Sequence, residues 1–292
     1  MAETWGFPIA LDLFFAGLAA GAFCLSVFAG RKKGEGFEAL SRAGAFLAPA
    51  SIVFGLAMLT LDLMSRERFW YTLSVFNVTS PMSMGAWLLT LFALVSVAYG
   101  LCRLPGPVLS RVPVAGGAVA RRRAVCLRVL GTAGVPLALA VSVYTGVLLS
   151  VSSLPFWRNG ALPALFCSSA MTTGFAGGAL AALRTGAPEA MERPLLWLRS
   201  AYRVLLSCCL AFALLFTVLA FLNTQRGDPC RLFTGWTGAL WWAGVVGLGI
   251  LLPLALMADG ERTGRRRLAA AFWLVLAGGF LLRLVIVFAG QA

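Results

Sequence analysis

The sequence of 292 residues contains no histidine. Haem groups in membrane cytochromes are usually held by histidine, so a haem ligated in that way is excluded. The C-x-x-C spacing that is typical of zinc and iron–sulfur sites does not occur among the seven cysteines. Six of them lie in or beside apolar runs, where a thiol packs as a small hydrophobic group. We therefore expect this chain to hold no haem, no iron–sulfur cluster and no other metal.

Charged residues are also scarce, at 12% of the chain, whereas 60% of residues are hydrophobic. Soluble domains are about a quarter charged and about half apolar. The mean hydropathy is +0.88, and the apolar residues form long runs. These features predict an integral membrane protein. The first five residues contain an acid and no base, so we expect the first apolar run to remain in the protein rather than to be cleaved as a signal peptide.

Eight apolar runs are each about 20 residues or longer, enough for a helix to cross a hydrocarbon layer of about 30 Å. They lack the two-residue alternation of barrel strands. The predicted fold is all-α, with eight transmembrane helices in one membrane domain over residues 1–292. The expected spans are residues 7–30, 42–64, 83–104, 125–151, 160–184, 202–223, 236–258 and 268–290.

Basic residues are distributed unequally between the two sets of loops. Of the 24 lysines and arginines, 18 lie at the loops that follow the odd-numbered spans, five lie in the opposite loops, and Arg283 lies inside the last span. The positive-inside rule therefore places both termini in the periplasm. It also explains the net charge of +13 without nucleic-acid binding. The loops are short, so any reaction outside the bilayer must be carried out by a partner subunit.

Aromatic residues at the predicted outer ends of the spans are expected to anchor the chain at the membrane interface. They are Trp5, Phe69, Trp70, Tyr71, Phe156, Trp157 and Trp236.

Three ionisable residues fall within spans. Placing such a side chain within the membrane costs a few kcal/mol of free energy, so its presence indicates a function. Asp12, Asp62 and Arg283, together with Tyr144, lie in the outer parts of their helices by this topology. One interpretation is a structural ion pair between Arg283 and an aspartate. The other is a polar pocket for a quinone, whose reduction needs two protons with two electrons and therefore a nearby acid or base.

Small and hydroxyl residues indicate close helix packing. The hydroxyl residues of the fifth span are expected to bond between helices rather than to relay protons; they are Ser168, Ser169, Thr172 and Thr173. The glycines expected to permit close contact are Gly17, Gly21, Gly174, Gly177 and Gly178.

Several segments together resemble the NrfD/PsrC family of membrane subunits, which includes the quinone-reactive anchors of polysulfide reductase and formate-dependent nitrite reductase. The similarity occurs in order along the chain. It is carried by WGFPIALDLFFAGLAAGAF at 5–23, LDLMSRERFW at 61–70, VTSPMSMGAWLL at 78–89, YTGVLLS at 144–150, LPFWRNGALPALF at 154–166 and LLRLVIVFAG at 281–290.

This resemblance implies two four-helix bundles and a quinone site near the periplasmic face. It also implies a periplasmic partner with four ferredoxin-like iron–sulfur clusters; a molybdopterin enzyme or a multihaem cytochrome often completes such a complex. By position, Tyr144 matches a tyrosine that reaches the quinone, Arg283 matches the arginine of the last helix, and Asp12 replaces a histidine. Relatives often have Asp-Leu-Gly-Arg-Pro where this chain has Asp62-Leu63-Met64-Ser65-Arg66.

The sequence thus predicts a quinone-binding subunit of a respiratory complex in the bacterial cytoplasmic membrane. Menaquinone or ubiquinone would bind near Asp12, Tyr144 and Arg283; Asp12, Asp62 and Arg283 would take part in the chemistry, with the aspartates handling protons. Candidate residues for partner docking are Arg66, Arg68, Trp70, Asn77, Arg158 and Arg231. Two alternatives stay open: a purely structural anchor, and a proton-translocating, energy-coupling subunit. A solute transporter is disfavoured because the sequence shows no internal repeat.

Overall fold

The computed structural model describes residues 6–62, 80–104, 116–152, 154–186, 189–222, 232–258 and 264–291, and in these ranges every regular element is a helix. Eight helical spans are long and apolar enough to cross a membrane. They are α1 (Phe7–Gly30), α2 (Glu35–Asp62), α4 (Pro81–Cys102), α6 (Gly116–Ser150), α7 (Leu162–Thr185), α8 (Glu192–Leu222), a seventh formed by α9 (Gly235–Ala239), η5 (Leu240–Leu251) and α10 (Leu252–Ala258), and α11 (Arg265–Gln291). Two single-turn helices, η2 (Pro155–Trp157) and η3 (Glu189–Met191), precede α7 and α8.

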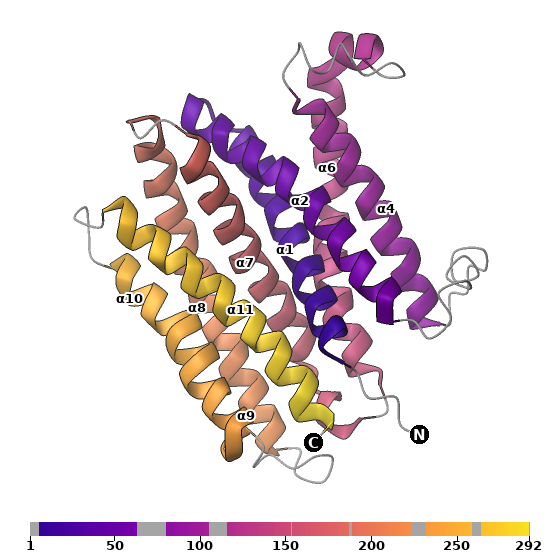
Figure 1. Ribbon diagram of the computed structural model, residues 1–292, viewed down its shortest axis with the longest axis vertical. Coiled ribbons are helices and arrows are strands. Elements are labelled where there is room, and N and C mark those ends of the chain that lie inside the picture. The colour runs from indigo at the N-terminus through magenta and orange to yellow at the C-terminus, as the bar shows by residue number, and fades with distance from the viewer. Residues whose placement is uncertain are drawn as a thin grey trace.

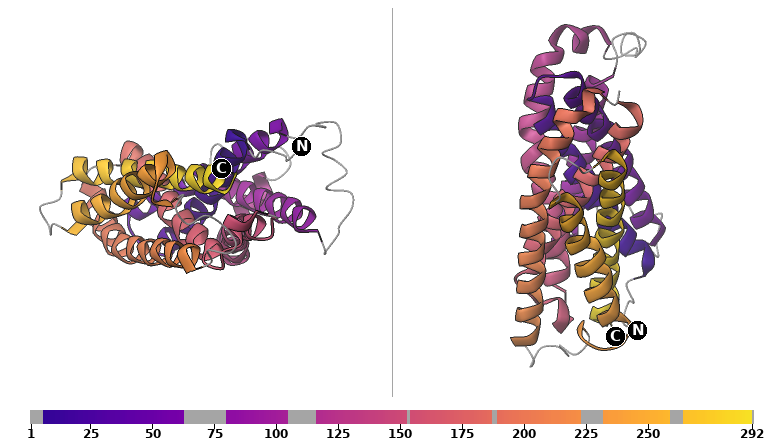
Figure 2. Two further views of the ribbon diagram at one scale, coloured as in Figure 1. Left: turned by 90° about the horizontal axis from the view of Figure 1, so that it is seen from below. Right: turned by 90° about the vertical axis from the view of Figure 1, so that its left-hand side faces the viewer.

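The helices form two bundles of four, as the family resemblance implies (Figure 1). Helices α1, α2, α4 and α6 make the first bundle, and α7, α8, the seventh span and α11 make the second. The bundles meet at α7, on which α1, α2 and α6 pack, and α1 also packs on α11 (Figure 2). Both termini lie at one end of the molecule, which we name the terminal end.

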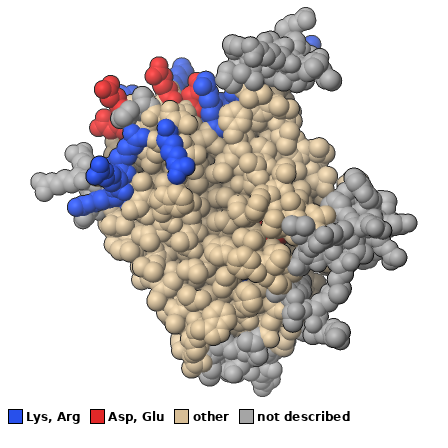
Figure 3. Space-filling model, viewed as in Figure 1, with Lys and Arg blue, Asp and Glu red and all other residues tan. Residues whose placement is uncertain are grey.

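Lysine and arginine side chains gather at the opposite end, and the face shown between the two ends carries almost no charge (Figure 3). We name this the basic end; it contains the ends of α1, α4, α7 and α10 and the starts of α2, α6, α8 and α11. All four helices that begin there start before the predicted spans, at Glu35, Gly116, Glu192 and Arg265 instead of residues 42, 125, 202 and 268. The hydropathy pattern locates the membrane-crossing part, whereas arginine, alanine and leucine continue a helix beyond it.

The seventh span contains a feature that no residue pattern signals. Its middle, η5, follows the wider π-helical hydrogen-bonding pattern over 12 residues. Such helices usually occur as single turns. Gly249 in this segment lies against Gly278 of α11, where a side chain on Gly278 would overlap the Gly249 backbone. Two facing glycines therefore set the close approach of η5 and α11.

Glycines also form the junction between the two bundles, which confirms the predicted close packing. A side chain on Gly21 of α1 would overlap the backbone of Ala170 in α7 and would lie 2.8 Å from the Gly174 Cα. In the same way, a side chain on Gly174 would overlap the backbone at Gly21 and Ala22. Backbone contact of this kind is how membrane helices gain packing energy without a hydrophobic driving force.

Replacing Gly174 with alanine should therefore destabilise the protein, because the new methyl group forces α1 and α7 apart. Overpacking of a tight contact typically costs about 1–3 kcal/mol. The matched control is Gly160→Ala, since nothing lies within 4 Å of that position. Thermal unfolding in detergent should show a lower midpoint for Gly174→Ala alone; equal midpoints for the two variants would contradict the backbone contact.

Candidate functional site

Arg283 of α11 is fully buried, with 0% of its surface exposed. Its Nη1 donates to Ser169 Oγ of α7 at 2.7 Å and to the Gly279 carbonyl at 2.8 Å. Its Nε donates to the Leu13 carbonyl of α1 at 3.3 Å. The guanidinium thus connects α11 to α1 of the first bundle and to α7 of its own bundle.

The space for this guanidinium comes from Gly17 of α1, where a Cβ would lie 2.7 Å from Arg283 Nη2. The rings of Phe14 and Phe166 flank the charge, with their centroids 5.9 and 5.4 Å from Cζ. Nη2 is buried and has no hydrogen-bond partner among the described residues. Arg283 is therefore a buried cation held by three oxygen acceptors and two aromatic rings.

Asp12 of α1 is also buried, at 7% exposure, and its Oδ1 has no hydrogen-bond partner in the part of the protein that the structure describes. The carboxylate points toward α2, where a Cβ on Gly55 would lie 3.1 Å from Oδ1. Leu13 and Gly17 contact Arg283 from a different face of α1. Asp12 and Arg283 form no ion pair, so the predicted structural ion pair is wrong for Asp12; the only described ion pair joins Glu38 and Arg42.

Tyr144 of α6 lies half-buried against the start of α4. Its hydroxyl donates to the Pro81 carbonyl at 3.0 Å. The ring crosses the backbone of Gly85, where any side chain would overlap the Tyr144 hydroxyl. Asp12 and Tyr144 thus both lie in the first bundle toward the terminal end, Asp12 against α2 and Tyr144 against α4, and Arg283 lies on the other side of α1.

Asp62 is the last residue of α2, and its side chain lies outside the described part of the structure. The same holds for five of the six predicted docking residues: Arg66, Arg68, Trp70, Asn77 and Arg231. The sixth, Arg158, is exposed at the terminal end, with its Nε 3.5 Å from the Ser152 carbonyl.

Of the aromatic residues expected at the membrane interface, Trp5, Phe69, Trp70 and Tyr71 lie outside the described residues, and Phe156 is buried. Trp157, also expected at the interface, is fully buried. Its Nε1 donates to the Ile286 carbonyl of α11 at 2.8 Å, and Asn159 Nδ2 donates to the Phe216 carbonyl of α8 at 3.0 Å. The connection between α6 and α7 thus closes the terminal end of the second bundle. A tryptophan near a helix end gives the same sequence signal in either role; here η2 and the turn after it direct the Trp157 and Asn159 side chains into the bundle. Trp236 is 55% exposed, as an interface residue would be.

The predicted interhelical role of the hydroxyl residues in α7 is right for Ser169, which accepts from Arg283. Ser168, Thr172 and Thr173 donate to carbonyls of their own helix. Beside them lies a small cavity between α7, α8, η5 and α11, with room for about one water molecule. Among the described residues no cluster of three acidic, cysteine or histidine side chains could hold a metal.

Known proteins resemble this chain along its whole length. A family profile described as "Polysulphide reductase, NrfD" matches residues 1–292. The chain belongs to the NrfD family. It is 31% identical to a polysulfide reductase chain of Wolinella succinogenes, over 99% of this sequence and 94% of that protein. It is 30% identical to NrfD of Escherichia coli, over 99% and 95%, and 26% identical to a selenate reductase subunit of Mesobacillus selenatarsenatis, over 89% and 68%.

The contacts of Arg283 predict that Arg283→Gln lowers stability. The substitution removes a charge-assisted hydrogen bond to Ser169, and bonds of this class contribute about 1.5–3 kcal/mol. The thermal midpoint in detergent should fall, and Arg283→Lys should recover only part of the loss, because one ammonium cannot reach both α1 and α7. Arg266→Gln, an exposed change on the same helix, is the control. A midpoint unchanged by Arg283→Gln would show that the three bonds do not stabilise the fold.

Proposed function

We propose that this NrfD-family protein is the quinone-reactive membrane subunit of a bacterial respiratory oxidoreductase complex. In the proposal it lies in the cytoplasmic membrane, with the terminal end at the periplasmic face and the basic end at the cytoplasmic face. Quinone or quinol binds in the first bundle near Asp12 and Tyr144. Electrons pass between it and an iron–sulfur subunit at the terminal end, and a molybdopterin or multihaem protein completes the complex.

The observation that carries the proposal is the buried Asp12 carboxylate, whose Oδ1 has no hydrogen-bond partner among the described residues. The Tyr144 phenol lies toward the same end of the same bundle. Leaving a buried polar group unpaired is expensive, and such groups inside a membrane indicate function. Purely structural packing would be served as well by an apolar residue at position 12.

Quinone is a lipid-soluble carrier of two electrons and two protons, and the residues of this protein are suited to its binding. The Tyr144 hydroxyl, which now donates to the Pro81 carbonyl, can donate to a quinone carbonyl instead. Tyr144 is half-buried, so it can meet a ligand that enters from the lipid. The Asp12 carboxyl is the group in this region that can take up or release a proton. Asp62, for which the sequence predicts a role in proton handling, would extend the route toward the terminal end.

Arg283 enters the proposal as a positioning residue. Its bond to the Leu13 carbonyl fixes the rotation of α1, and Asp12 is the residue directly before Leu13 in that helix. A direct contact between Arg283 and quinone, which the sequence predicts, would require a ligand to reach the fully buried guanidinium past Phe14 and Phe166. The reductase names of the relatives support a role in a reductase complex; the substrate of this complex belongs to a partner subunit.

We expect Asp12→Asn to lower quinol oxidation by the purified, assembled complex, because the amide cannot exchange a proton. Loss of a general acid or base typically lowers the rate about 100-fold or more. The rate would be followed as the decrease of a reduced menaquinone or ubiquinone analogue, and the presence of every subunit would be checked on the same sample. A full rate in a normally assembled Asp12→Asn complex would favour the structural anchor and refute the proposal.

Tyr144→Phe should also slow quinol oxidation and raise the quinol concentration needed for half-maximal rate, because a donor to the carbonyl is lost. Tyr202→Phe is the matched control, since Tyr202 is buried in the second bundle and donates to the Thr172 carbonyl. Gly85→Ala should resemble Tyr144→Phe, because the new methyl group displaces the phenol. Equal rates for Tyr144→Phe and Tyr202→Phe would contradict the assignment of Tyr144.

A further inference from the structure

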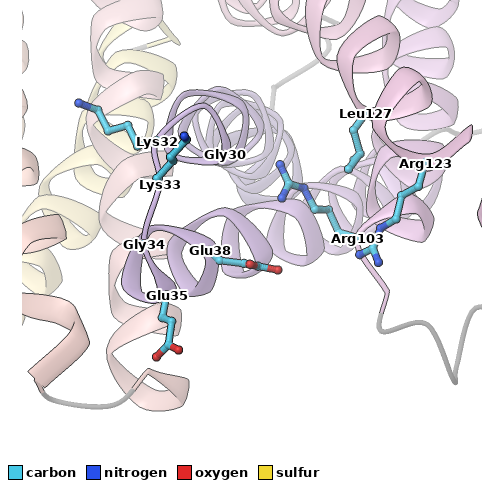
Figure 4. A pocket seen from close by; sticks show the side chains of 9 residues that line it. All are labelled: Gly30, Lys32, Lys33, Gly34, Glu35, Glu38, Arg103, Arg123 and Leu127. Carbon is cyan, nitrogen blue, oxygen red and sulfur yellow. The ribbon is translucent and has the colours of Figure 1, made fainter.

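A charged cleft opens at the basic end of the first bundle, far from Asp12 and Tyr144. Two adjoining cavities of about 540 and 370 Å³ share Gly30, Arg103 and Leu127 and so form one cleft between α1, α2, α4 and α6 (Figure 4). Its volume is in the range of ligand sites. The quinone proposal does not use this cleft.

The lining of the cleft is strongly basic. Two carboxylates are present, and one of them, Glu38, is paired with Arg42 at 2.6 Å. The other, Glu35, is exposed at the start of α2. Against these stand six cations, which are Arg31, Lys32, Lys33, Arg103, Arg123 and Arg128. The Lys32 ammonium lies over the Phe37 and Trp197 rings and points away from Arg103. The excess of positive charge selects an anionic ligand.

Two of these arginines are held in place by the protein. The Arg103 guanidinium stacks on the Tyr99 ring at 5.5 Å from its centroid, and Nη2 donates to the Tyr99 hydroxyl at 3.1 Å. Arg123 Nε donates to the Cys102 carbonyl at 2.8 Å. Gly30 leaves the space for Arg103, because a side chain there would overlap its guanidinium. The buried Arg103 Nε has no hydrogen-bond partner among the described residues. This is a prearranged group of donors rather than a set of freely solvated charges.

Part of the lining of the cleft is apolar. It contains Val27 of α1 together with Leu127 and Gly131 of α6, which are one helical turn apart on the same face. A charged cleft with an apolar stretch of lining matches an amphiphile, and a free phosphate ion would leave that stretch unused.

We propose that this cleft binds an anionic glycerophospholipid from the leaflet that the basic end faces. Its phosphate contacts Arg103 and Arg123, with Lys33 and Arg128 at the rim, and an acyl chain follows α6 past Leu127 and Gly131. The six cations favour a headgroup with two phosphates, as in cardiolipin, over one with a single phosphate. Basic pockets between membrane helices are a known means of holding such headgroups.

The test is lipid binding to the full-length protein after delipidation in detergent, measured by native mass spectrometry with cardiolipin, phosphatidylglycerol or phosphatidylethanolamine. We expect cardiolipin to bind most tightly and phosphatidylethanolamine least. Each basic residue near an anionic lipid surface contributes about a fivefold change in affinity, so the double substitution Arg103→Gln with Arg123→Gln should weaken cardiolipin binding roughly 30-fold.

A second double variant, Lys33→Gln with Arg128→Gln, guards against misfolding, because these side chains are exposed and make no described internal bond. It should weaken binding as well. The matched control is Arg266→Gln with Arg267→Gln, which removes the same charge from the start of α11, outside the cleft. If the control variant weakens cardiolipin binding equally, the effect comes from general surface charge and the proposed lipid site is wrong.

Inorganic phosphate separates the two sources of the anion. We expect millimolar phosphate to leave bound cardiolipin in place. If phosphate displaces the lipid and binds the delipidated protein equally well, or if phosphatidylethanolamine binds as tightly as cardiolipin, the phospholipid assignment is wrong. Quinol oxidation reports on the proposed quinone site near Asp12 and Tyr144. Its rate should be unchanged in an assembled complex that carries both Lys33→Gln and Arg128→Gln.

Discussion

The arrangement of this protein depends on the contact between α1 and α7, where backbone meets backbone. Gly21 and Gly174 allow the approach, and Gly17 leaves room beside it for the Arg283 guanidinium. In a membrane, helices gain little from excluding solvent, so close packing and hydrogen bonds must hold them together. At the junction of the two bundles, the hydrogen bonds come from Arg283, which donates to the Leu13 carbonyl and to Ser169. A buried cation is acceptable there because oxygen acceptors and two aromatic faces surround it.

The same junction determines the orientation of α1, and with it the position of the candidate site. Successive residues of a helix are separated by about 100°. Once the Leu13 carbonyl and Gly17 face Arg283, Asp12 must point to another side, and it points to α2 at Gly55. Helix α1 is thus shared between the two bundles, with the buried arginine on one face and the buried carboxylate on another. A change at Arg283 would act on Asp12 through the rotation of α1 rather than by direct charge pairing.

Much of this architecture could be predicted from the sequence, because hydrophobic runs, glycine spacing and loop charges each follow from the membrane environment. The eight spans and the close helix contacts at Gly21 and at Gly174 are examples. The relative positions of Asp12 and Arg283 could not be predicted. Topology places a residue at a depth, and the two do lie at similar depths, but it says nothing about which way each helix is turned. The buried Trp157 and the π-helical η5 were missed for a related reason: both depend on neighbouring helices that a single stretch of sequence does not contain.

The two bundles also differ in what fills them. The second contains several of the largest buried side chains, among them Trp157, Trp241 and Tyr202, and the small cavity at its centre leaves room for about one water molecule. The first bundle also buries large side chains, among them Tyr99, Phe23 and Phe92. It differs in holding the unpaired Asp12 carboxylate toward one end and the basic cleft at the other. Both proposed ligand sites therefore fall in the first bundle, which packs on the second through α1, α2 and α6.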